Sequence, residues 1–190
     1  MSSRLTEIRW HGRGGQGAVT AAKMVAEIAA ERGKCFQAFP EYGPERSGAP
    51  IVAFTRLSED PIQCYYAIEH PDLVLVLDDT LLSVVDVTEG ASDDAVIIVN
   101  TEKSPDDIKK GFDFGSRRVL TVPATKIAKQ TLGRAIPNTP MVSALSRITG
   151  YFSLEEIEDH LRHTFGKKFP QKVVDANVEA AKMAFQEVRE

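Results

Sequence analysis

Two periodicities of apolar residues run along this chain, and together they predict alternating strands and helices. Short apolar runs bounded by turn residues indicate strands, and runs with an apolar residue every three or four positions indicate helices. The predicted strands are 5–10, 34–39, 51–57, 62–66, 73–77, 95–99 and 118–122. The predicted helices are 18–31, 80–87, 124–132, 138–149, 153–165 and 171–188, with a further helical turn from Pro105 that Ser104 caps.

This order of elements predicts an α/β fold, a three-layer α/β/α domain with a mixed, mostly parallel sheet and a helical C-terminal part. The runs 73–77 and 95–99 are continuously apolar, which is typical of parallel strands buried on both faces. Only four residues separate 51–57 from 62–66, so we expect an antiparallel hairpin there. Because no internal repeat or low-complexity linker divides the chain, residues 1–190 are expected to form one domain.

A glycine-rich turn joins the first strand to the first helix in a Rossmann-like βα unit. Its sequence is Gly12-Arg13-Gly14-Gly15-Gln16-Gly17. Glycines permit positive φ and a close approach of the backbone, and the helix start offers unpaired N–H groups and the positive end of its dipole. We therefore expect the turn to face an anion. The alternative is that the glycines only allow the strand and helix to pack tightly.

A dinucleotide site would also need an acidic residue at the end of the second strand, to hold the ribose hydroxyls. The nearest one is Glu41, which follows Pro40 and lies in a loop. A stand-alone nucleotide-binding function therefore rests on the glycine turn alone. His11, at the mouth of the turn, is interpreted as a hydrogen-bonded spacer.

Composition and charge argue against several classes of protein. The formal net charge of -4, without a long basic run, argues against a general nucleic-acid binder. No apolar stretch is long enough to cross a bilayer and no signal peptide is evident, so we expect a cytoplasmic protein without a membrane partner. Cys35 and Cys64 are expected to be buried free thiols, and two cysteines cannot supply the four thiolates of an ordinary iron–sulfur cluster. No histidine has partners at metal-ligand spacing, so no metal site is predicted.

Three motifs in register resemble the gamma subunit of 2-oxoacid:ferredoxin oxidoreductases of the pyruvate synthase type. They are the glycine turn, Tyr42-Gly43-Pro44-Glu45-Arg46-Ser47-Gly48-Ala49-Pro50 and Ile136-Pro137-Asn138-Thr139-Pro140-Met141. The resemblance implies a complex that oxidatively decarboxylates a 2-oxoacid, conjugates the acyl group to coenzyme A and reversibly reduces ferredoxin. The second motif is closer to the pyruvate-type pattern, which favours pyruvate. The small subunit of indolepyruvate oxidoreductases shares the glycine-rich opening and is the alternative.

The resemblance also implies where the cofactors lie. Thiamine diphosphate, Mg and iron–sulfur clusters are expected on companion alpha-, beta- and delta-type subunits, and coenzyme A is expected as co-substrate at an interface with this chain. The isolated chain is predicted to be inactive, with no catalytic residue of its own. An obligate subunit should expose an apolar patch, expected here around 42–50 and 138–149, where the isolated chain could self-associate.

The candidate cofactor-binding residues come from all three motifs. They are Gly12, Arg13, Gly14, Gly15, Gln16, Gly17, Glu45, Arg46, Asn138 and Thr139. The guanidinium groups of Arg13 and Arg46 match phosphate geometry and stay charged, so Arg13 is expected to pair with a coenzyme A phosphate. The alternatives are a solvated Glu45–Arg46 pair and a glycine turn that only packs against a companion subunit.

Overall fold

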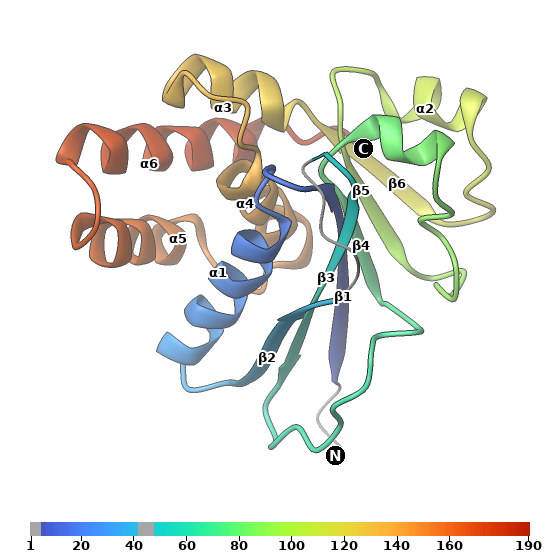
Figure 1. Cartoon of the computed structure of the whole chain (residues 1–190), viewed down its shortest axis with the longest axis horizontal. Helices are drawn as coiled ribbons and strands as arrows, with labels where there is room; N and C mark the ends of the chain where they lie inside the picture. The colour runs from blue at the N-terminus through green and yellow to red at the C-terminus, as the bar shows by residue number, and fades with distance from the viewer. Residues whose placement is uncertain (1–4, 42–47) are drawn as a thin grey trace.

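A six-stranded mixed sheet forms the middle layer of the molecule, and helices cover both of its faces (Figure 1). The computed structural model describes residues 5–41 and 48–190. The strands are β1 (Thr6–Arg13), β2 (Cys35–Pro40), β3 (Pro50–Ser58), β4 (Leu73–Val76), β5 (Val96–Asn100) and β6 (Arg118–Val122). The helices are α1 (Ala18–Glu31), η1 (Asp79–Ser83), α2 (Pro105–Gly111), α3 (Ala124–Leu132), α4 (Asn138–Thr149), α5 (Leu154–His160), η2 (Leu161–Phe165) and α6 (Gln171–Gln186).

The strand order is β2-β3-β1-β4-β5-β6. The pairs β1–β4, β4–β5 and β5–β6 are parallel, whereas β3 runs antiparallel to both of its neighbours. The predicted three-layer fold with a mixed, mostly parallel sheet is therefore confirmed. The chain leaves β1 toward β3 and β2 on one side and returns to β4 on the other, so the carboxyl ends of β1 and β4 lie at the switch point where α/β proteins bind ligands.

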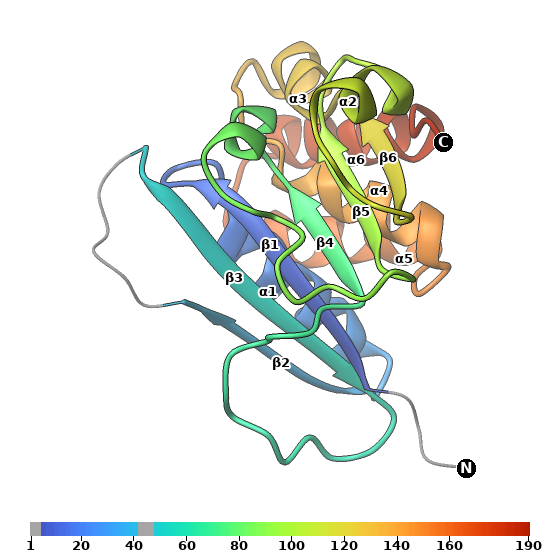
Figure 2. The same ribbon diagram turned by 90° about the vertical axis from the view of Figure 1, so that its right-hand side faces the viewer.

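The two helical layers are unequal. On one face α1, α3, α4, α5 and α6 bury the larger core, which includes Trp10 of β1 and Leu75 of β4. On the other face, η1, α2 and the adjoining loops of the described residues cover β4, β5 and β6. Figure 2 shows this second face, with the segment between β3 and β4 crossing in front of β2.

The predicted hairpin between 51–57 and 62–66 is wrong. Because β3 already pairs with β1 and with β2, it has no free edge for another strand. Residues 62–66 instead form an irregular segment, held where the Gln37 side chain donates to the Cys64 carbonyl at 2.9 Å and where the Arg56 guanidinium lies over the Tyr66 ring. Tyr65 and Tyr66 are 84% and 65% exposed. Cys35 and Cys64 are free but only half-buried, so their predicted burial is wrong too.

Helix α4 is the most deeply buried helix of the domain. It packs against α1, α3, α5 and α6, and every residue from Asn138 to Ser146 is buried. The predicted apolar surface patch at 138–149 is therefore wrong, because these apolar side chains form the core of the chain itself. The other predicted part of that patch, 42–50, lies mostly outside the described residues. The predicted helix 80–87 is also shorter than expected, since only the 3₁₀ turn η1 forms there.

The end of the chain returns to the sheet. Arg189 pairs with Thr121 of β6 through two backbone hydrogen bonds of 3.0 and 2.8 Å. The Arg118 guanidinium contacts the Glu190 carboxylate at 2.7 Å. Along the described part of the chain, none of the helices is both long and apolar enough to cross a membrane.

Candidate functional site

The glycine turn lies at the carboxyl end of β1, directly before α1. Strand β1 continues to Arg13, further than the sequence predicts, because its pairing with β3 extends to Pro50. A hydrogen bond of 3.0 Å from the Gln16 N–H to the Arg13 carbonyl then closes the turn. Gly15 and Gly17 have φ of 96° and 84°, values that favour glycine.

Asn138, at the start of α4, packs against the glycine turn. A Cβ on Gly17 would lie 3.2 Å from the Cβ of Asn138, so a side chain at this position would press the turn against the start of α4. Thr139 is fully buried, and its hydroxyl donates to the Asn177 side chain in α6 at 3.0 Å. The third motif therefore brings Asn138 to the turn and directs Thr139 into the core.

The start of α1 presents free hydrogen-bond donors. Its first backbone bond inside the helix runs from the Ala21 N–H to the Gly17 carbonyl at 2.8 Å. Within the described residues, the N–H groups of Ala18, Val19 and Thr20 make no hydrogen bond, and the first turn of α1 carries no acidic residue. Such a helix start can bind an anion through its N–H groups and its dipole.

Arg13 is already engaged within the chain. Its guanidinium donates to the Gly48 carbonyl at 3.1 Å and to the Thr80 hydroxyl at 2.9 Å, and its Nε lies 3.3 Å from the Asp78 carboxylate. These contacts tie the turn to the residues before β3 and to the start of η1. Arg13 thus stabilises the glycine turn through its contacts with these neighbouring segments. Glu45 and Arg46 lie outside the described residues.

The side chain of Gln16 points from the glycine turn toward Asp78, at the end of β4. Its amide Nε2 donates to the Asp78 carboxylate at 2.7 Å, and its Oε1 accepts from the Arg13 N–H at 2.8 Å. Burial alone would raise the pKa of Asp78, but hydrogen bonds from Thr80 and Gln16 and the charge of Arg13 together hold it below its ordinary value. Asp78 is therefore an ionised carboxylate at neutral pH, neutralised by Arg13.

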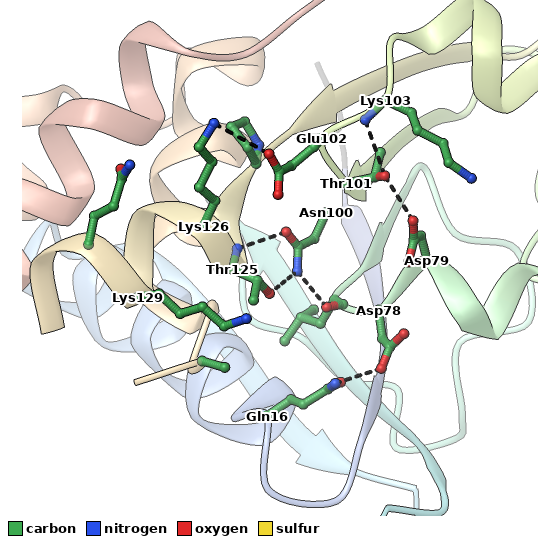
Figure 3. Close-up of a pocket in the computed structure, with 14 residues that line it drawn as sticks. Gln16, Asp78, Asp79, Asn100, Thr101, Glu102, Lys103, Thr125, Lys126 and Lys129 are labelled. Carbon is green, nitrogen blue, oxygen red and sulfur yellow. Dashed lines mark hydrogen bonds and ion pairs between the residues drawn. The ribbon is translucent and has the colours of Figure 1, made fainter. Parts of the chain in front are cut away.

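A cavity of about 570 Å³ opens beside Gln16, at the carboxyl ends of β4 and β5 and against α3 (Figure 3). It is lined by Gln16, Leu77, Asp78, Asp79, Asn100, Thr101, Glu102, Lys103, Pro123, Thr125, Lys126, Lys129, Gln130 and Ala135. The amine of Lys129 points into the cavity, whereas that of Lys103 points away from it. The Lys126 amine lies 3.3 Å from the Glu102 carboxylate. Lys129 is therefore the cation of the wall that is available to a ligand.

Asn100 forms the floor of the cavity. Its Nδ2 donates to the Leu77 carbonyl and to the Thr125 hydroxyl, both at 2.7 Å, and its Oδ1 accepts from the Thr125 N–H at 2.9 Å. One amide thus joins the ends of β4 and β5 to the start of α3. Residue-by-residue analysis of the sequence missed Asn100 and Lys129, although a polar residue directly after an apolar strand and a lysine on the helix that follows the last strand are usable signals.

The strand order also bears on whether the glycine turn belongs to a dinucleotide-binding site. In a Rossmann domain the acidic residue lies on the strand next to the glycine turn. Here β3 separates β2 from β1, which places the exposed Glu41 about 10 Å to the side, two strand spacings from the turn. Glu41 therefore does not lie beside the turn, where a ribose ligand would be expected.

His11 does not serve as the predicted hydrogen-bonded spacer. It lies on the opposite face of β1 from Trp10 and is buried, and its Nε2 has no hydrogen-bond partner. Burial, followed by the nearby positive charge of Arg9, lowers the pKa of His11 to about 4. The imidazole is therefore neutral at physiological pH.

Comparison with known proteins identifies the family. A model of the pyruvate ferredoxin/flavodoxin oxidoreductase family matches residues 7–187. The chain belongs to this family. The resemblance stated from the three motifs is confirmed by this match, and the free donors at α1 and the cavity beside Gln16 are features of a member of this oxidoreductase family.

The similarity to relatives in the oxidoreductase family extends over nearly the whole chain. Pyruvate synthase subunit PorC of Thermotoga maritima is 49% identical over 189 residues, covering 100% of this chain and 97% of the relative. The pyruvate/ketoisovalerate oxidoreductases common subunit gamma of Pyrococcus abyssi is 45% identical over 185 residues, covering 97% and 98%. The crystal structure of pyruvate oxidoreductase subunit PORC from Thermotoga maritima has a TM-score of 0.84 at 46% identity, covering 98% of each chain. These relatives favour neither the indolepyruvate alternative nor a stand-alone nucleotide-binding protein.

Proposed function

We propose that this chain is the gamma subunit of a complex that oxidatively decarboxylates pyruvate, transfers the acetyl group to coenzyme A and reduces ferredoxin. The relatives named as subunits of pyruvate synthase and pyruvate oxidoreductase support this proposal over the full length of the chain. Thiamine diphosphate, Mg and the iron–sulfur clusters belong to companion subunits of alpha, beta and delta type, and the complex is cytoplasmic. Without its companions the chain is inactive.

Within the complex, the proposed role of this chain is to hold coenzyme A. The observation that carries this role is the cavity beside Gln16, into which Lys129 points. The unpaired N–H groups at the start of α1 follow Gln16 closely along the chain and add hydrogen-bond donors near this cavity. Coenzyme A is rich in phosphate, and backbone N–H groups at a helix start, together with a lysine, form a typical phosphate site. Gln16 and Asp78 fix the turn, and Arg13 braces it, so the donors keep their positions before a ligand arrives.

The name of the Pyrococcus abyssi relative supports the same division of labour. That protein is called a subunit common to pyruvate and ketoisovalerate oxidoreductases, so the two enzymes share it although their 2-oxoacids differ. A shared subunit is suited to bind what the two reactions have in common. Coenzyme A fulfils this condition, whereas the side chain of the 2-oxoacid does not.

The test compares two lysines in the assembled complex. Lys129→Gln should raise the coenzyme A concentration needed for half-maximal pyruvate oxidation. The expected loss of binding free energy is about 1.5–3 kcal/mol, the range for hydrogen bonds to charged groups. Lys103→Gln is the matched control, because Lys103 belongs to the same wall but its amine points away from the cavity. The pyruvate requirement should stay unchanged in both. Equal coenzyme A requirements in the two variants would reject the site and favour a turn that only packs against a companion subunit.

A further inference from the structure

The turn between η2 and α6 presents a continuous exposed surface. Every residue from 166 to 173 is exposed, and we call this segment the α5–α6 tip. In Figure 1 the tip projects at the far left, where the chain turns from α5 into α6, on the side away from the sheet. It includes none of the residues that line the cavity beside Gln16.

The tip is positively charged in a chain of negative net charge. Lys167, Lys168 and Lys172 lie within it, and no acidic residue occurs between Asp159 and Asp175, although the chain as a whole has a net charge of -4. Among the described residues, none of these three lysines forms an ion pair; the Lys167 amine contacts only the His163 ring, at 2.8 Å. Their charge is thus free to attract an acidic surface.

An aromatic ring lies at the centre of this charge. Phe169 is 47% exposed, yet its ring is held edge-to-face against Phe165 at 5.5 Å between centroids. Its N–H donates to the Phe165 carbonyl at 2.8 Å, and Phe165 packs against the main core at the end of the π-helical turn η2. Val173, also exposed, lies in the first turn of α6. The tip therefore holds its apolar centre in a fixed position.

We propose that the α5–α6 tip is a docking surface for a companion subunit that presents acidic side chains around an apolar pocket. The proposal rests on the proposed function as a subunit of a complex. A rigid aromatic anchor inside a charged ring matches the usual anatomy of a protein interface, in which a buried aromatic gives affinity and rim charges give steering. Two apolar side chains are too few to insert into a bilayer with useful strength, so a protein surface fits better than a membrane.

The test measures binding of the labelled chain to the companion subunits produced without it, at several salt concentrations. Phe169→Ser should weaken binding about thirtyfold, the effect of losing a hot-spot aromatic. The double variant Lys168→Glu, Lys172→Glu should also bind more weakly, and added salt should no longer weaken its binding as it does for the unmodified chain. Lys109→Glu, at an exposed position on α2, is the charge-reversal control and should bind normally. Thermal unfolding of each variant checks that the fold is retained.

The possible results separate this inference from the proposed function. If the unmodified chain does not bind the companion subunits, the proposed function fails and the docking surface fails with it. If the unmodified chain binds but both tip variants bind equally well, only the docking surface is overturned. Tip variants that assemble normally but need more ferredoxin for half-maximal reduction would likewise overturn it, and would assign the tip to the electron carrier.

Discussion

The side-chain amide of Gln16 donates to the carboxylate of Asp78 at 2.7 Å, and this bond ties the glycine turn to the end of β4. The same side chain accepts from the N–H of Arg13, so Gln16 uses both ends of its amide to hold the turn. An ionised Asp78 is required for this arrangement, because the carboxylate accepts from Gln16 and also from the N–H and hydroxyl of Thr80. The geometry of the proposed anion site therefore depends on one glutamine.

Gln16→Glu tests this dependence. The new carboxylate cannot donate to Asp78 and repels it, so we expect the free energy of unfolding to fall by about 1–3 kcal/mol and the coenzyme A requirement of the complex to rise. Adding Asp78→Asn to the same chain should recover part of both losses, since an amide at 78 can donate to the new carboxylate. Urea unfolding and coenzyme A titration provide the two measurements. A double variant that is no better than the single one would contradict the assigned contact.

Alanine at two glycines should have unequal effects. Gly15 and Gly17 both have positive φ, which costs a residue with a side chain about 1–2 kcal/mol. A Cβ at 15 meets open space, whereas a Cβ at 17 meets Asn138 at 3.2 Å, so Gly17→Ala carries a further overpacking cost of about 1–3 kcal/mol. Urea unfolding of the two variants, each compared with the unmodified chain, measures the difference. Equal losses would show that α4 yields to the added methyl group.

Local chemistry explains which predictions from the sequence succeeded. The helix predicted over 153–165 begins where expected, because Ser153 and Glu156, three residues apart, form a capping box with both of its hydrogen bonds. The strand, glycine turn and helix of the first βα unit are also confirmed. The strand predicted at 62–66 was wrong because an apolar run does not reveal that both edges of β3 are already paired, one with β1 and the other with β2.

The site divides in the same way. The glycine turn was predictable because its residues are contiguous in sequence. The residues that contact it, Asn138 and Asp78, and Lys129 of the adjoining cavity come from three other segments of the chain. The role of Arg13 was also beyond the sequence, because the contacts that occupy its guanidinium come from Gly48, Thr80 and Asp78. Only the fold determines that this charge braces the turn.

His11 should make stability depend on pH below neutrality. Burial lowers its pKa from the ordinary 6.5 to about 4, so between these values the unfolded chain binds a proton that the folded chain excludes. Its contribution is fully present above pH 6.5 and is lost as the pH falls toward 4, by about 3 kcal/mol in total. His11→Gln, which does not titrate, should flatten this part of the profile. Unfolding by urea at several pH values between 7 and 4 measures it, and parallel profiles would contradict a buried neutral imidazole.

Asn100→Asp should weaken the floor of the cavity. The substitution removes both donors, to the Leu77 carbonyl and the Thr125 hydroxyl, and leaves a charge in a buried position. We expect a loss of at least about 2 kcal/mol at pH 7. Relative to the unmodified chain at each pH, the deficit should narrow at pH 4, where a protonated carboxyl regains one donor. A deficit that is the same at both pH values would mean that the donors of Asn100 contribute little.

The pairing of Arg189 with Thr121 has a consequence for the association behaviour of the protein. An outer strand of a sheet presents unpaired backbone groups that can recruit another chain and start aggregation. Arg189 occupies the backbone N–H and carbonyl of Thr121 on β6, and the Glu190 carboxylate contacts the Arg118 guanidinium at the start of the same strand. Arg189 and Glu190 thus protect the outer edge of β6. Shortened versions that stop before Arg189 would leave this edge open to pairing between molecules.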